Sequence, residues 1–380
     1  MSAMRRLLEL MAEKKASDIF ISCGAPINIK INGVTMPINQ QIVTPDAART
    51  LMKEILNERQ LKEFEDEFEL NTSYPIPGMG SFRISCFMQR TTPGVVVRFI
   101  PGDVPQFDTL GLPPTLKDVV LEKRGLILMV GATGSGKSTS LAAMIDHRNA
   151  LMSGHIITIE DPIEFLFKHK KSIVNQREIG ADALSLQVAM KNAMRQAPDV
   201  MFIGEIRDRE TMGAAVAYSM SGHLVVATMH ATNSSHALNR VISFYSPETR
   251  QALFQDLAAS LKAIVSQRLL RAKRSGRMPA VEILQNSGHM TDLIERGDVP
   301  AIKEAMERSL APGSQSFEQS LYTLLQKDLI TRDDALAAAD SKNNLLWMIN
   351  NSGKVQQAPE AATPKKEPEP ASFSEFTLNI

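Results

Sequence analysis

The eight residues 131–138, GATGSGKS, decide the fold of this chain. They match the P-loop pattern G-x-x-x-x-G-K-[S/T], they follow the apolar run 126–130, and they open a helix at Thr139. Glycines let backbone N–H groups turn inward around a β-phosphate, and the start of the helix adds partial positive charge. Lys137 would place a charge on the β- and γ-phosphate oxygens, and Ser138 would ligate Mg²⁺. The stretch predicts a site for ATP and Mg²⁺, lined by Gly131, Ala132, Thr133, Gly134, Ser135, Gly136, Lys137, Ser138 and Thr139.

The surrounding sequence has the alternating strand and helix patterns that are typical of a parallel α/β sheet. From residue 116 short apolar runs, typical of buried strands, alternate with helical patterns; the runs are 126–130, 156–159, 200–203 and 224–227. Beyond residue 247 we predict mostly helices, including one over 248–270. The main α/β domain is therefore expected to span residues 116–350.

Residues 1–100 predict a separate, small α+β domain. An amphipathic opening helix is followed by alternating strands, a hairpin turn at Asn32-Gly33 and a helix that begins at Thr44-Pro45. The proline-rich segment 101–115 is expected to be the linker between the domains. Residues 351–380 hold scattered charges and prolines with little apolar spacing, so we expect a disordered tail.

Composition narrows the class of protein. The 380 residues include 42 Lys and Arg and 42 Asp and Glu, so the formal net charge is +0, which argues against a protein whose main partner is duplex nucleic acid. Two cysteines are too few for a disulfide scaffold or a four-cysteine zinc site. No secretory leader and no uninterrupted apolar run of about 20 residues is present, which predicts a cytoplasmic protein without a transmembrane segment.

Acidic residues end two of the expected strands, at the sheet edge where α/β proteins bind ligands. Glu205 follows the run 200–203 at the position of a Walker B acid, although an aspartate is more usual there. The segment 160–164, EDPIE, has three carboxylates, one of which could position or deprotonate an attacking water. The alternatives are a surface carboxylate at Glu205 and a solvated turn at 160–164.

Two histidines, His223 and His230, bracket the strand 224–229. A histidine at the end of a strand is more often structural than catalytic, and no third ligand stands at metal-binding spacing, which makes zinc improbable.

These segments resemble the secretion ATPases of type II and type IV pilus systems, and within them the PilT/PilU family of pilus retraction ATPases. The motifs, in order, are Walker A at 131–139, the aspartate box at 158–165, Walker B at 204–208 and the histidine box at 222–230. The resemblance extends over roughly residues 1–350. It implies a PAS-like N-terminal domain and a RecA-like P-loop ATPase domain with a helical C-terminal part.

Within the family the chain is more similar to the PilU branch. The PilT motif AIRNLIRE is missing, and residues 301–308 stand in its place. The stretch 316–322 and the acidic, proline-containing tail after residue 350 look PilU-like. The long N-terminal domains and zinc tetracysteine of the extension ATPases are also missing, which argues against an assembly motor.

The resemblance implies roles for individual residues. Glu164 would be the general base, Glu205 the acid that acts on Mg²⁺ and its water, and His230 part of a phosphate-sensing shell. Family members form hexamers in which N-terminal arginines reach the phosphates of the neighbouring subunit, and Arg83 and Arg98 lie at matching strand positions. Without the family, each arginine would be taken as a solvated strand residue.

The function implied is a hexameric ATP-hydrolysing motor of pilus retraction, in the cytoplasm and attached peripherally to the inner membrane. Its expected partners are other copies of itself, a PilT-type retraction ATPase and the inner-membrane platform protein of the pilus. One alternative is an accessory ring subunit that depends on the PilT-type motor. A weaker alternative is a nucleic-acid translocase.

Overall fold

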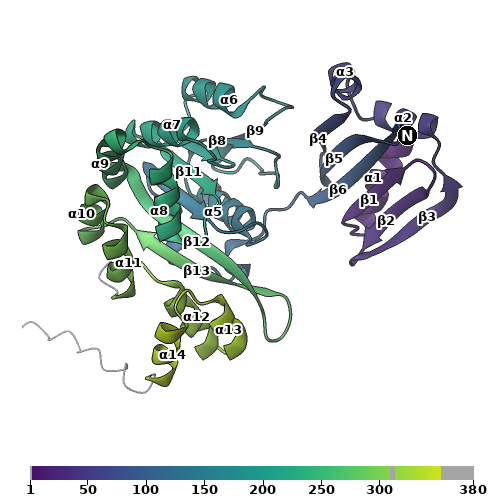
Figure 1. Cartoon of the computed structure of the whole chain (residues 1–380). Coiled ribbons are helices and arrows are strands. Elements are labelled where there is room, and N and C mark those ends of the chain that lie inside the picture. Colours follow the sequence, from purple (N-terminus) through teal and green to yellow (C-terminus); the bar gives the residue numbers. More distant parts are fainter. Residues whose placement is uncertain (1, 309–312, 352–380) are drawn as a thin grey trace, which may run out of the picture.

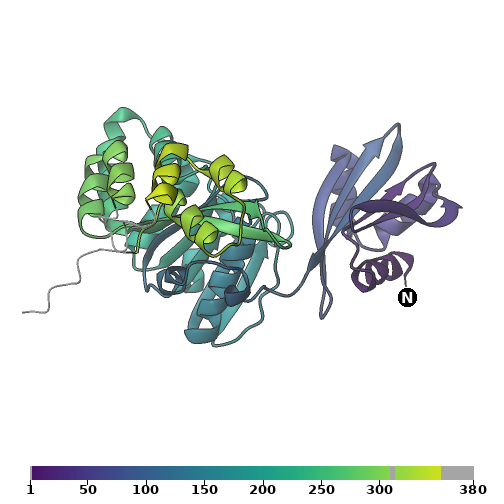
Figure 2. The same ribbon diagram turned by 90° about the horizontal axis from the view of Figure 1, so that it is seen from below.

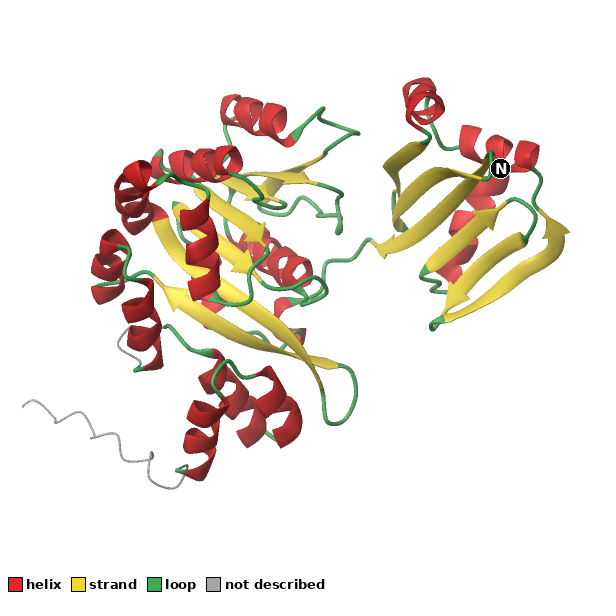
Figure 3. Cartoon of the chain, in the orientation of Figure 1, coloured by secondary structure: helices red, strands yellow, loops and turns green. Residues whose placement is uncertain are grey.

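The computed structural model describes residues 2–308 and 313–351, so that all but the first residue of the expected tail lies outside the described part. The chain forms two bodies joined by a single connecting segment (Figure 1). Each body is built on its own β-sheet, and helices cover the larger sheet on both faces (Figures 2 and 3). No described helix combines the length and apolar character needed to cross a bilayer.

The N-terminal body is a six-stranded antiparallel sheet in the order β3-β2-β1-β6-β5-β4, with three helices. Its elements are α1 (Ala3–Glu13), β1 (Asp18–Ser22), β2 (Pro26–Ile31), β3 (Val34–Ile42), α2 (Pro45–Lys53), α3 (Glu58–Glu67), β4 (Glu69–Ile76), β5 (Gly80–Gln89) and β6 (Thr92–Pro101).

The expected local signals of this body are confirmed. Asn32 and Gly33 form the two-residue turn of the β2–β3 hairpin, both with positive φ. The Thr44 hydroxyl accepts a hydrogen bond from Ala47 N–H and so caps α2, whose first residue is Pro45. Met4, Leu8 and Met11 of α1 are buried in the core of the sheet. Helix capping and apolar spacing thus account for the local folding here.

The C-terminal body is a seven-stranded sheet in the order β13-β12-β7-β11-β10-β8-β9. Only the pairing of β12 with β13 is antiparallel. Its strands are β7 (Gly125–Val130), β8 (Gly154–Glu160), β9 (Ser172–Glu178), β10 (Val200–Ile203), β11 (Leu224–Met229), β12 (Leu261–Arg271) and β13 (Arg277–Gln285).

Helices lie on both faces of this sheet. One face packs on α4 (Thr115–Val120) and α5 (Lys137–Leu151). The other packs on α6 (Leu186–Ala193), α7 (Arg209–Met220), α8 (Ser234–Ser243), α9 (Arg250–Ser260), α10 (His289–Arg296) and α11 (Val299–Glu307). A separate small core joins the ends of β12 and β13 to α12 (Phe317–Gln326), α13 (Arg332–Ala338) and α14 (Lys342–Asn350).

Short 3₁₀ helices complete the body. They are η1 (Phe107–Thr109), η2 (Met194–Gln196) and η3 (Pro247–Thr249). Phe107 of η1 and Leu112 are buried in the core beside α4, so the second half of the segment 101–115 packs on the C-terminal body.

The helix predicted over residues 248–270 is wrong. A helix occupies only residues 250–260, and residues 261–271 form β12, which pairs with β7 on one side and β13 on the other. Five consecutive residues from Ala263 to Gln267 have 0–2% exposure, so both faces of the strand are covered. A strand buried on both faces lacks the alternation of apolar and polar residues by which a half-buried strand is told from a helix in a sequence.

Candidate nucleotide site

The P-loop connects the end of β7 to the start of α5. Gly134 and Gly136 have φ of 78° and 86°, a region that side chains rarely adopt, and a Cβ on Gly136 would lie 2.7 Å from Gln267 Nε2. Lys137 Nζ donates hydrogen bonds to Gly131 O at 2.7 Å and Ala132 O at 2.9 Å. Burial lowers the pKa of Lys137, and the nearby Glu205 and Glu164 oppose that shift. The lysine therefore lies in the loop with two carboxylates facing it.

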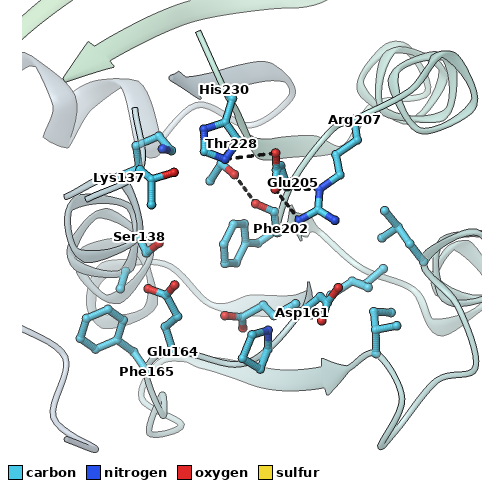
Figure 4. Close-up of a pocket in the computed structure, with 18 of the residues that line it drawn as sticks. Lys137, Ser138, Asp161, Glu164, Phe165, Phe202, Glu205, Arg207, Thr228 and His230 are labelled. Atoms are coloured by element: carbon cyan, nitrogen blue, oxygen red, sulfur yellow. Dashed lines mark hydrogen bonds and ion pairs between the residues drawn. The ribbon is translucent and has the colours of Figure 1, made fainter. Parts of the chain in front are cut away.

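A cavity of about 390 Å³ lies at the carboxyl end of the parallel strands beside this loop. Figure 4 shows side chains from separate parts of the chain converging on it. Its lining includes Lys137 and Ser138 from α5, Glu164 from the loop after β8, Glu205 after β10 and His230 after β11. The structure thus brings together five of the residues singled out in the sequence.

Glu205 is held by two basic side chains. Arg207 binds one of its oxygens, Oε2, through Nη2 at 2.8 Å and Nε at 2.9 Å, and His230 Nε2 lies 3.4 Å from Oε1. The contact with Glu205 raises the pKa of Arg207. Glu205 is therefore a partly enclosed carboxylate facing the cavity rather than a free surface acid.

The three carboxylates of the aspartate box occupy different surroundings. Glu160, at the end of β8, is 7% exposed, and its Oε1 accepts hydrogen bonds from Thr158 Oγ1 at 2.7 Å and Gln176 Nε2 at 3.2 Å. Burial raises its pKa to about 7. Asp161 and Glu164 line the cavity, and Glu164 points toward Ser138 in Figure 4. The segment 160–164 is therefore not a fully solvated turn.

Some expected residues lie elsewhere. His223 is at the opposite end of β11 from His230, where its Nδ1 lies 3.0 Å from Ser221 Oγ. Arg83 and Arg98 face each other across β5 and β6, away from the cavity of their own chain. Arg98 Nε lies 2.9 Å from Asp18 Oδ1. Neither arginine is among the residues that line the cavity of its own chain.

Sequence reasoning missed several polar residues around the site. Gln267 on β12 donates from Nε2 to Ser135 O at 2.9 Å and accepts from Ser140 Oγ at 2.8 Å, so it ties the P-loop to α5. The Thr228 hydroxyl donates to Gly204 O, which links β11 to the residue before Glu205. Arg207 lies within the Walker B segment 204–208 and Thr228 within the histidine-box segment 222–230, but neither was given a role of its own, and Gln267 lies in none of the four motifs.

The donor set at the cavity suits Mg²⁺. The hydroxyl of Ser138 and the carboxylate of Glu205 supply hard oxygen ligands to one space, and Mg²⁺ usually takes one or two protein oxygens together with phosphates and waters. Among residues 2–308 and 313–351 no group of three or more His, Cys, Asp or Glu side chains could hold a metal without such a ligand. The residues therefore fit a metal that arrives with a nucleotide.

The model of the Type II/IV secretion system protein family matches residues 2–316. The chain belongs to this family. It is 47% identical over 345 residues to the type IV pilus ATPase PilU of Pseudomonas aeruginosa, with 90% of each chain covered. It is 36% identical over 338 residues to the retraction ATPase PilT of the same organism, covering 89% of this chain and 98% of PilT.

The fold agrees with these sequence relatives. A crystal structure of the pilus retraction motor PilT with bound ADP superposes with a TM-score of 0.85 at 35% identity, covering 92% of this chain and 100% of the other. The family relationship inferred from the four motifs is therefore confirmed, as is the mixed α/β fold with a separate N-terminal domain.

Proposed function

We propose that this protein is an ATPase of type IV pilus retraction. The observation that carries the proposal is the cavity that unites Lys137, Ser138, Glu164 and Glu205 at the carboxyl edge of the sheet. The similarity to PilU and PilT supports a role in pilus retraction, and the ADP bound in the PilT structure supports nucleotide binding. The reaction is hydrolysis of ATP to ADP and phosphate.

The residues divide the chemistry between them. Lys137 leaves the carbonyls of Gly131 and Ala132 and binds the phosphate oxygens, where its charge offsets the charge of the transferring group. Ser138 and Glu205 would hold Mg²⁺, which would supply further charge neutralisation. Glu164 faces the same space and accepts a proton from the attacking water. His230, beside Glu205, responds to the presence of the γ-phosphate.

The functional unit is proposed to be a ring of six copies. In this arrangement Arg83 and Arg98 come from the N-terminal body of a neighbouring subunit, because neither reaches the cavity of its own chain. Arginines supplied in trans accelerate phosphoryl transfer by about 10³–10⁵ in other enzymes. The ring would act at the cytoplasmic face of the inner membrane, on the pilus platform protein and alongside a PilT-type motor.

A second candidate is an accessory ring whose ATP cycle depends on that motor. The ion pair between Arg207 and Glu205 favours it, since a carboxylate engaged by a guanidinium is less available to Mg²⁺. Steady-state ATP hydrolysis by the purified chain, alone and with the PilT-type partner, separates the two. Turnover by the chain alone supports the independent motor, and turnover only with the partner supports the accessory ring.

A further inference from the structure

The loop that carries Glu164 connects β8 to β9 without helix or strand of its own. Its backbone polar groups are instead bonded by side chains of neighbouring elements. Asn149 of α5 holds the far end, accepting from Lys170 N–H and donating to Lys168 O. A loop held in this way has the shape that those side chains impose.

Strand β9 supplies the contacts nearest to Glu164. Gln176 Nε2 donates to Phe165 O at 2.8 Å, and Gln176 Oε1 accepts from Phe167 N–H at 2.8 Å. Glu178, two residues further along the same face of the strand and 4% exposed, accepts from Ile163 N–H at 3.0 Å. Residues on both sides of Glu164 are therefore fixed by two side chains of one edge strand.

The carboxylate of Glu160 also links the loop to β9. The backbone of Glu164 opposes the rise that burial causes in the pKa of Glu160. The same carboxylate receives the second amide hydrogen of Gln176 at 3.2 Å. Gln176 lies directly beside Thr158 in the parallel pairing of β8 and β9, and Glu178 beside Glu160. The pairing of the two strands thus sets the position of the loop.

We infer that Gln176 and Glu178 are positioning residues for Glu164: they hold the backbone on either side of it so that its carboxylate faces the cavity. Neither side chain lines that cavity. The inference rests on the proposed role of Glu164 as the base. A displacement of about 1 Å in a catalytic group can cost as much as a hundredfold in rate.

The test replaces Gln176 by methionine, which has a similar length but cannot make any of the three amide hydrogen bonds, to Phe165 O, Phe167 N–H and Glu160. We expect kcat for ATP hydrolysis of the full-length chain to fall about 10- to 100-fold. Affinity for a fluorescent ADP analogue should stay within about twofold, because the P-loop is untouched. The matched control is Asn175→Met, since Asn175 is exposed and its side-chain amide pairs with His155 rather than with the loop that carries Glu164. Normal turnover in Gln176→Met would overturn the inference.

A double-mutant comparison separates positioning from general structural damage. In a Glu164→Gln background, Gln176→Met should cause no further loss of turnover. An equal loss in both backgrounds would contradict positioning. Wild-type turnover in Glu164→Gln alone would refute the role of Glu164 itself, and the inference with it.

Two further substitutions keep the test decisive if Gln176→Met does not fold. Glu178→Gln retains an acceptor for Ile163 N–H, so its turnover should stay within about threefold of the wild type. Glu178→Ala removes the acceptor and should lose turnover. Amide hydrogen exchange over residues 163–167 should quicken in Glu178→Ala and not in Glu178→Gln. Equal turnover and equal exchange in the two Glu178 variants would overturn the inference.

Discussion

Arg207 and Glu205 form an ion pair in the lining of the cavity, with Arg207 Nη2 2.8 Å from Glu205 Oε2. The Walker B acid is therefore engaged within its own chain. The Arg207 side chain is 65% exposed, so the pair is partly screened by solvent and can open at modest cost. If Glu205 is a Mg²⁺ ligand, as proposed above, the arginine and the metal would compete for the same carboxylate.

Replacing Arg207 by glutamine should ease metal binding. We expect the Mg²⁺ concentration for half-maximal binding of a fluorescent ATP analogue to fall about two- to fivefold, the size of an exposed ion pair. Titration of Mg²⁺ at fixed nucleotide measures this. Arg209→Gln is the control, because Arg209 lies over the Tyr245 ring instead. An unchanged or higher Mg²⁺ requirement in Arg207→Gln would exclude the competition.

Glu160 makes stability depend on pH. Its folded-state pKa is raised to about 7 from an ordinary value of 4.5, so the folded protein binds the extra proton between these values. The free energy of unfolding should therefore fall as pH rises from about 4.5 to 7, by roughly 3 kcal/mol at most.

Glu160→Gln tests this dependence because it keeps the shape of a protonated carboxyl. We expect it to match the wild type at pH 5 and to be more stable at pH 8 in urea unfolding. A variant that is less stable at pH 8 would show that Glu160 is stabilised as an anion instead.

Gly136 is required for more than its backbone conformation. Gly136→Ala adds a Cβ at 2.7 Å from Gln267 Nε2, in addition to the strain of a positive φ. Gly222→Ala introduces only the backbone strain, because φ there is 103° and no atom lies within 4 Å of the added Cβ. We expect Gly136→Ala to lower the melting temperature more and to abolish nucleotide binding, while Gly222→Ala retains it. If the two variants lower the melting temperature and nucleotide binding equally, the contact with Gln267 is not the reason that Gly136 is needed.

Arg268 attaches the C-terminal helices to the sheet. Its guanidinium lies 3.8 Å from the centre of the Phe317 ring and donates hydrogen bonds to Ala338 O, Thr232 O and Asp340. Arg268→Met keeps the apolar stem but leaves these acceptors without the donor, which should cost roughly 2 kcal/mol. Limited proteolysis within residues 316–350 should accelerate. Unchanged proteolysis and unfolding would mean that apolar packing alone holds these helices.

Local signals made much of this fold predictable from the sequence. The P-loop needs glycines, a lysine and a hydroxyl at fixed spacing, and the run 126–130 before it is β7. Strand β11 lies between His223 and His230, as predicted. Capping by Thr44 and the Asn32-Gly33 turn are likewise interactions between near neighbours in the chain.

The rest depended on contacts between distant residues. The hairpin of β12 and β13 was missed because β12 is buried on both faces and so lacks the alternation of apolar and polar residues that marks a strand. Gln176 and Gln267 bind backbone groups that only the folded sheet brings near them. Arg83 and Arg98 remain predictions, since their expected partner is a phosphate in another subunit.

The most direct test of the proposed chemistry is ATP hydrolysis by the full-length chain together with ATP binding in Glu164→Gln and Lys137→Ala. The measurement includes the PilT-type partner if the chain is inactive alone. We expect Glu164→Gln to bind ATP with wild-type affinity and hydrolyse it at least 100-fold more slowly. Lys137→Ala should keep its fold and lose affinity for ATP. Wild-type hydrolysis in Glu164→Gln, or wild-type affinity in Lys137→Ala, would contradict the account of this site.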